Sequence, residues 1–137
     1  MTVAKAQRGF TLIEMLVVLA VAAVLAAVAY PSYQSQVAKG RRADGKQALV
    51  ELAQKLERFY TERGTYAGAA LGAGGLYAEV SAGGYYTLAI ATQSADGFTI
   101  SATPKGAQAG DACGALGYNQ LGDRTRGGSG QTLEQCW

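Results

Sequence analysis

The stretch that decides the architecture of this chain is Gly9-Phe10-Thr11-Leu12-Ile13-Glu14, followed by the apolar run 15–30. Within residues 10–30 only Thr11, Glu14 and Tyr30 carry a polar group. These 21 residues would span roughly 30 Å as a helix, about the thickness of the hydrocarbon core of a bilayer. The stretch therefore predicts a membrane-spanning helix over residues 10–30.

Glu14 is the one charged residue in this segment. A charge near the centre of a bilayer costs roughly 2 to 4 kcal/mol, so it is seldom kept without a partner. If the chain is cut between Gly9 and Phe10, the new α-amine of Phe10 lies one helical turn from Glu14 and supplies a positive charge. The pattern thus predicts a processing point after Gly9 and a role for Glu14 that depends on it.

Two basic residues, Lys5 and Arg8, precede the apolar run. By the positive-inside rule they keep their end of the helix in the cytoplasm, so that the chain after about residue 31 faces outward. A secretory signal peptide cleaved at Ala27-Val28-Ala29 is an alternative, as is a plain signal anchor. Both alternatives leave Glu14 unexplained.

Residues 31–63 continue the helix as an amphipathic half. Pro31 disrupts the preceding turn, and Gly40 and Gly45 weaken the next one, so bends are expected there. Gly64 is a suitable residue to end the helix. The apolar positions recur at helical spacing and form one stripe: Ala48, Leu49, Leu52, Ala53, Leu56, Phe59 and Tyr60.

The composition changes after residue 63, because 16 of the 19 glycines occur in residues 64–137. This favours turns and short strands over further long helices. We expect a connecting surface loop at 64–84, a hairpin with strands at 85–92 and 98–103, and a third strand at 115–120. The sequence therefore predicts an α+β fold in which a small antiparallel sheet covers the apolar helix stripe.

The formal charge of +2 arises from Lys5 and Arg8, so the chain from Phe10 onward is neutral by the same count. This balance argues against a generally basic nucleic-acid-binding protein. Cys113 and Cys136 belong to no CxxC motif or Cys/His cluster, which argues against zinc and redox sites. In an exported head a disulfide between them is expected, and two reduced, packed thiols are the alternative.

Residues 8–31 resemble the class III signal of type IV pilins and pseudopilins, through the block Arg8–Glu14, the apolar stretch and Pro31. Residues 57–66 and the pair Cys136-Trp137 are similar to small minor pilins. The resemblance implies the pilin fold, with a long N-terminal helix packed on an antiparallel sheet. It also implies that residues 85–137 end in a disulfide-bounded region.

For function, the resemblance implies a type IV pilus subunit made as a prepilin in the bacterial inner membrane, with its head in the periplasm. A prepilin peptidase would remove residues 1–9 and methylate Phe10, and the assembly machinery would then incorporate the subunit beside major and minor pilins on the cell surface. Glu14 would pair with the Phe10 amine of a neighbouring subunit, or with its own. A pseudopilin of type II secretion is the alternative filament.

A catalytic role is not expected, because the chain has no histidine, no GxSxG, no P-loop and no suggestive acidic pair. No metal or cofactor is expected either, since Asp96, Asp111 and Asp123 are scattered and form no recognisable calcium loop. Adhesion, twitching motility and DNA uptake all stay open as roles of such a subunit.

A membrane-anchored binding module is the competing class of function. In it, two groups of basic residues would contact DNA or another anionic surface: Lys39, Arg41, Arg42 and Lys46, and Arg124 and Arg126. The simpler interpretation makes the first group a solvated or phospholipid-facing collar and places the second group in a turn.

Overall fold

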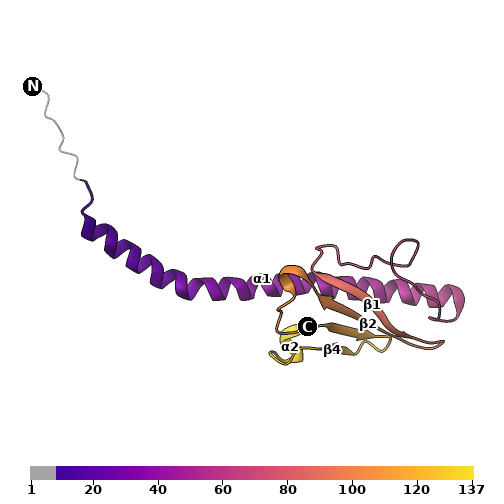
Figure 1. Cartoon of the computed structure of the whole chain (residues 1–137). Helices are drawn as coiled ribbons and strands as arrows, with labels where there is room; N and C mark the ends of the chain where they lie inside the picture. Colours follow the sequence, from indigo (N-terminus) through magenta and orange to yellow (C-terminus); the bar gives the residue numbers. More distant parts are fainter. Residues whose placement is uncertain (1–8) are drawn as a thin grey trace, which may run out of the picture. The chain divides into compact units, whose positions relative to one another are not determined.

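The computed structural model describes residues 9–137, so Lys5 and Arg8, on which the predicted membrane orientation rests, lie outside the described residues. One long helix is followed by a small antiparallel sheet, as predicted (Figure 1). The elements in chain order are α1 (Leu12–Arg63), β1 (Tyr86–Gln93), β2 (Phe98–Pro104), the 3-10 turn η1 (Gly106–Gln108), β3 (Leu116–Asn119), β4 (Arg124–Arg126) and α2 (Leu133–Cys136).

The chain divides into two structural units, with the boundary inside α1 between Gln36 and Val37. In the first unit, every residue from Gly9 to Gln36 is exposed. The second unit, residues 37–137, is the head and contains the hydrophobic core. The helical assignment continues through Pro31, and the bend predicted there stays a prediction.

The C-terminal end of α1 follows from the residue after it. Gly64 adopts a left-handed backbone conformation with φ of 70°, and its N–H donates to the carbonyl oxygen of Tyr60 at 2.7 Å. Glycine takes this conformation without steric cost, and the bond satisfies one of the last free carbonyls of the helix. The predicted stop at Gly64 is confirmed.

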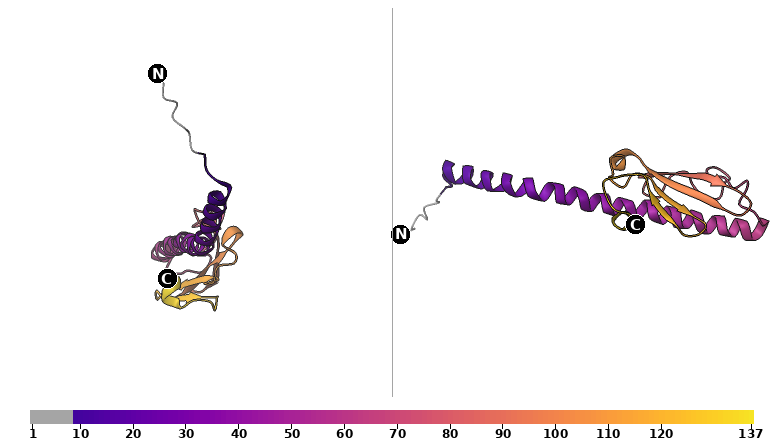
Figure 2. Two further views of the ribbon diagram at one scale, coloured as in Figure 1. Left: turned by 90° about the vertical axis from the view of Figure 1, so that its left-hand side faces the viewer. Right: turned by 90° about the horizontal axis from the view of Figure 1, so that it is seen from below.

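The sheet has the strand order β1-β2-β3-β4, and every neighbouring pair is antiparallel. Ile100 of β2 lies opposite Ile90 of β1 and Tyr118 of β3, and a bulge interrupts β1 between Ile90 and Thr92. Alternate side chains of β1 and β2 are buried, as a sheet with one covered face requires. Figure 2 shows the strands along one side of the second half of α1.

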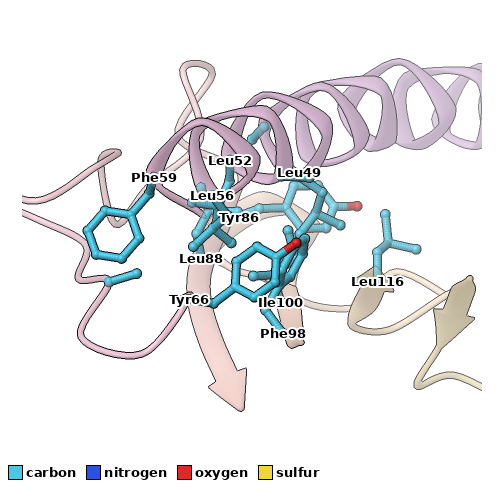
Figure 3. Close-up of a cluster of buried hydrophobic side chains, with 14 of the residues drawn as sticks. Leu49, Leu52, Leu56, Phe59, Tyr66, Tyr86, Leu88, Phe98, Ile100 and Leu116 are labelled. Atoms are coloured by element: carbon cyan, nitrogen blue, oxygen red, sulfur yellow. The ribbon is translucent and has the colours of Figure 1, made fainter. Parts of the chain in front are cut away.

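The core of the head lies between this part of α1 and the inner face of the sheet (Figure 3). The predicted helix stripe provides one side of it, although Tyr60 lies at the margin and is 36% exposed. Among the largest side chains, these are fully buried: Leu49, Leu52, Leu56, Tyr86, Ile100 and Leu116. At about 1.5 to 3 kcal/mol for each such side chain, burial is what holds the sheet on the helix.

The connecting segment 64–85 contains only isolated β-bridges, Leu71 with Tyr77 and Val80 with Thr87. It differs from the expected surface loop, because Tyr66 and Ser81 are buried in the head. A chain segment whose side chains enter the core cannot be told from an exposed loop by its Ala- and Gly-rich composition.

Three short elements were not predicted: η1, β4 and α2. Arg124 and Arg126, interpreted as part of a turn, form the edge strand β4 instead, where Arg124 lies opposite Tyr118 and Arg126 opposite Leu116. A strand of three residues has too short a pattern to be recognised by alternation.

Candidate functional site

The N-terminal segment is the first candidate site, and its geometry centres on Thr11 and Glu14. The backbone N–H of Thr11 donates to Oε2 of Glu14 at 3.4 Å, and the N–H of Glu14 donates to Oγ1 of Thr11 at 3.3 Å. This is the reciprocal arrangement of a capping box, and it satisfies two N–H groups that the helix start leaves free. The Thr-x-x-Glu spacing is visible in the sequence, and our sequence reasoning missed it.

The capping box gives Glu14 a local role in addition to the predicted one. It holds the carboxylate in the first turn of α1, where the helix dipole favours a negative charge. Gly9 and Phe10 precede the helix, and a Cβ placed on Gly9 would meet nothing within 4 Å. Cleavage after Gly9 and the pairing of Glu14 with a Phe10 amine both stay predictions.

The apolar surface of the first unit is the second feature of this site. Within α1, an 18-residue window reaches a mean hydropathy of 2.8 with none of it buried, so the helix is long and apolar enough to cross a membrane. The large apolar side chains from Phe10 to Tyr33 are exposed, from 49% at Met15 to 81% at Phe10. Because soluble monomers rarely expose so large an apolar patch, this surface needs lipid or other helices around it.

The four residues of the first basic group predicted for anion binding have different environments in the folded head. Arg42 is a buried residue, because its guanidinium binds both carboxylate oxygens of Asp111 at 2.7 to 3.0 Å and also reaches the carbonyl of Gln135. The interpretation of Arg42 as a surface cation is therefore wrong. A guanidinium buried without a counter-charge would be strongly destabilising, and the counter-charge comes from Asp111, 69 residues away in sequence.

The other members of this group are held near the surface. Arg41 donates to the carbonyl of Ala107 and lies over the ring of Tyr85, 4.8 Å from its centroid. Lys46 donates to the backbone oxygen of Trp137 at 2.9 Å. Lys39 is exposed, so the group does not form one uniform basic collar.

The second basic group lies on β4. Arg126 donates to the carbonyl of Gly128, and the guanidinium of Arg124 lies 5.4 Å from the centroid of the Trp137 ring. Arg124 is exposed, and no carboxylate lies within ion-pair distance of it among residues 9–137. The fold thus leaves Arg124 available to an anion.

The predicted disulfide joins Cys113 to Cys136, and both residues are fully buried. It ties the segment before β3 to α2. The Thr132 side chain and the N–H of Gln135 complete a capping box at the start of α2. Trp137 follows directly, so the disulfide also fixes the residue that Lys46 and Arg124 contact.

The three aspartates considered for calcium are not brought together by the fold. Asp111 binds Arg42, and Asp123 accepts from the side-chain amide of Asn119 at 2.9 Å. Among residues 9–137, no group of three or more His, Cys, Asp or Glu side chains is placed to hold a metal ion.

Comparison with known proteins indicates the class of protein to which this fold belongs. The fold is similar to that of the non-core minor pilin PilV of Neisseria meningitidis, with a TM-score of 0.58 at 22% identity, covering 72% of this chain and 95% of that one. A type IV pilin of Shewanella oneidensis also matches, with a TM-score of 0.47 and 29% identity over 69% of this chain and 98% of that one. Residues 4–30 match the prokaryotic N-terminal methylation motif.

The fold and the motif together define a protein of the type IV pilin class. Residues 31–117, more than half of the chain, match the family model described as "Type IV minor pilin ComP, DNA uptake sequence receptor". The chain therefore belongs to this family of type IV minor pilins. It is also 31% identical over 101 residues to the fimbrial protein EcpC of Eikenella corrodens, covering 74% of this chain and 65%, just under two thirds, of that relative.

Proposed function

We propose that this chain is a minor structural subunit of a type IV pilus and has no catalytic activity. One observation carries the proposal: the matched methylation motif opens a helix whose apolar surface, residues 12–30, has no cover from the rest of the described chain. Such a surface suits a subunit that is first held in a bilayer and then packed against the helices of other pilins. The minor-pilin match favours a pilus over a secretion pseudopilus.

The proposed sequence of events begins in the inner membrane. A prepilin peptidase cuts after Gly9 and methylates the amine of Phe10 on the cytoplasmic side, while the head faces the periplasm. The assembly machinery then moves the subunit into the filament, beside major and minor pilins. There Glu14 pairs with the Phe10 amine of a neighbour, which sets the axial register of the packed helices.

The intact mass and N-terminal sequence of the protein from its native membrane test the processing step. We expect a chain that starts at methylated Phe10. Its mass should be lower by two hydrogens than that of the reduced form, because of the Cys113–Cys136 bond. A chain that starts at Tyr30, as cleavage by a signal peptidase would give, would refute the proposal.

Replacing Glu14 by alanine tests the assembly step. The Glu14→Ala variant should enter the membrane normally, because the substitution makes the segment more apolar, but its amount in sheared pili should fall at least tenfold. The control is Glu62→Ala, on the exposed surface of α1, which should be incorporated like the wild type. Normal incorporation of Glu14→Ala would show that Glu14 serves only to cap α1.

We propose DNA binding as a second function of the same subunit. The family match to a DNA uptake sequence receptor favours it, and so does Arg124, an exposed head cation without a carboxylate partner among the described residues. Cations of this kind bind phosphates and release counterions, so affinity falls steeply with salt. Adhesion and motility have no comparable observation in their favour.

The test uses the full-length protein in a neutral detergent and a fluorescently labelled DNA duplex. Anisotropy should report binding at low salt, with an affinity that falls as salt is raised. Absence of binding at low salt would refute DNA binding and leave the pilus proposal intact.

A further inference from the structure

A cleft of about 500 Å³ lies on the head between α1 and the β4 edge of the sheet. Lys46, Val50 and Glu51 line it from α1, and Arg124 and Trp137 line it from the other side. All five residues belong to the head unit. The cleft is therefore built from residues that lie far apart in sequence and meet only in the folded head.

The indole of Trp137 is held from several directions. Its Nε1–H donates to the carbonyl of Thr125 at 2.9 Å, and its ring lies 6.0 Å from that of Tyr118 between centroids. The preceding residue, Cys136, is tied to Cys113. A ring with this many restraints gives the cleft a rigid wall.

The guanidinium of Arg124 packs against the indole of Trp137. It lies over the indole at 5.4 Å from the ring centroid, and the side chain has no hydrogen-bond acceptor among residues 9–137. Stacking on an aromatic ring fixes the plane of a guanidinium and leaves its N–H groups free along the edge. A planar fork of this kind matches the oxygens of a phosphate group.

Lys46 adds a second cation. Burial, and then the positive charges of Arg42 and Arg124, lower the pKa of the Lys46 ammonium. The carboxylate of Glu51 also lines the cleft, where it accepts hydrogen bonds from the hydroxyl of Tyr77 at 2.6 Å and from the amide of Gln47 at 2.8 Å. The side chains that line the cleft therefore carry two positive charges, on Lys46 and Arg124, against the one negative charge of Glu51.

We propose that the Lys46–Arg124–Trp137 cleft is a contact site for the phosphodiester backbone of double-stranded DNA. Arg124 and Lys46 bind phosphate oxygens, and Val50 and the edge of the indole contact the adjoining sugar. This inference rests on the proposed DNA-binding function and assigns it to one surface. Isolated surface cations such as Lys105 lack the stacked, rigid support that Arg124 has.

Trp137 is the single tryptophan of the chain, so its emission reports directly on the cleft. Full-length protein in neutral detergent is titrated with an unlabelled duplex while this emission is followed, and anisotropy of a labelled duplex reports total binding. We expect both signals to change at the same DNA concentrations. Two variants, Arg124→Gln and Lys46→Gln, remove one cation each. Arg124→Lys keeps the charge but removes the planar guanidinium. Lys105→Gln is the control.

Arg124→Gln should weaken binding about tenfold and lower the slope of log affinity against log salt by roughly 0.9 for each phosphate that the variant no longer neutralises. Arg124→Lys should fall in between, and Lys105→Gln should stay within about twofold of the wild type. Near-UV circular dichroism verifies that each variant keeps the packing of the head.

The outcomes separate the two proposals. If DNA binds but leaves Trp137 emission unchanged, and Arg124→Gln binds like the control, the cleft is excluded and DNA binding stands. If DNA does not bind the wild type even at low salt, both the DNA-binding proposal and its assignment to the cleft are refuted. If vesicles of anionic phosphatidylglycerol change the emission and DNA does not, the cleft contacts lipid headgroups and our assignment is overturned.

Discussion

Gly45 shows how one residue changes meaning between sequence and structure. As a glycine in a helix it is a weak point, and the sequence predicted a bend there. In the head it lies against Tyr86, and a Cβ placed on it would lie 2.8 Å from the Tyr86 ring. Gly40, five residues earlier, has nothing within 4 Å of such a Cβ. Gly45 therefore allows α1 and β1 to approach each other closely, whereas Gly40 has no such role.

The two glycines form a matched pair for mutation. Gly45→Ala should lower the free energy of unfolding by about 1 to 3 kcal/mol, because overpacking outweighs a gain of about 1 kcal/mol in helix propensity. Gly40→Ala should raise it by about 0.5 to 1 kcal/mol. Urea unfolding of the full-length protein in detergent, followed by circular dichroism, measures both. Equal effects of the two substitutions would contradict the proposed contact role.

The buried pair of Arg42 and Asp111 provides a second prediction at this scale. Asp111→Asn should cost about 3 to 5 kcal/mol, because it leaves the guanidinium buried without a counter-charge. The control is Glu62→Gln, which breaks the exposed pair with Arg58 and should cost about 0.5 kcal/mol or less in water. Urea midpoints compare them, and similar costs would show that burial of the first pair has no energetic consequence.

At the scale of elements, the connecting segment 64–85 is held to α1 by tyrosine hydroxyls. Tyr66 donates to Glu57 at 3.0 Å, and Tyr77 donates to Glu51 at 2.6 Å. In each case burial, and then the hydrogen bond to the glutamate, raises the pKa of the tyrosine to about 12. The neutral hydroxyl is therefore favoured in the folded state.

A raised pKa in the folded state has a defined effect on stability. The unfolded chain ionises near the ordinary tyrosine value of about 10, so the contribution of these groups is complete below that pH and is lost as the pH rises toward 12. The urea midpoint should fall between about pH 9 and about pH 11.5. Tyr77→Phe should show a smaller fall over the same range. An identical fall in both proteins would mean that Tyr77 does not contribute.

At the scale of the whole head, the disulfide closes the C-terminal segment onto the sheet. Replacing Cys113 and Cys136 by serine should lower the free energy of unfolding by about 3 kcal/mol, on the chain-entropy estimate for a loop of this length. Trp137 emission should shift to longer wavelength as well, because its neighbour Cys136 is no longer tied. Reductant should reproduce both changes in the wild type and neither in the double variant.

Local patterns were enough to predict much of this molecule. The apolar run and Gly64 predicted α1 to within two residues at its start, and the strand and turn signals after residue 84 predicted β1, β2 and β3 with small errors at their ends. The pairing of the two cysteines was also predicted, because two cysteines allow only one disulfide within the chain. Each of these inferences depends on residues close in sequence, or on a chemistry with a single solution.

The tertiary structure decided where the charged and aromatic side chains of the head go. It buried Arg42 against Asp111, turned Glu51 toward Tyr77, and brought Lys46, Arg124 and Trp137 to one cleft. None of these contacts has a sequence signal, because their partners are separated by 13 residues or more, as Arg124 and Trp137 are. The sequence also does not distinguish a charged residue that is solvated from one that is buried. Periodicity reports which face of an element is apolar, whereas the partner of a polar group depends on how the elements pack.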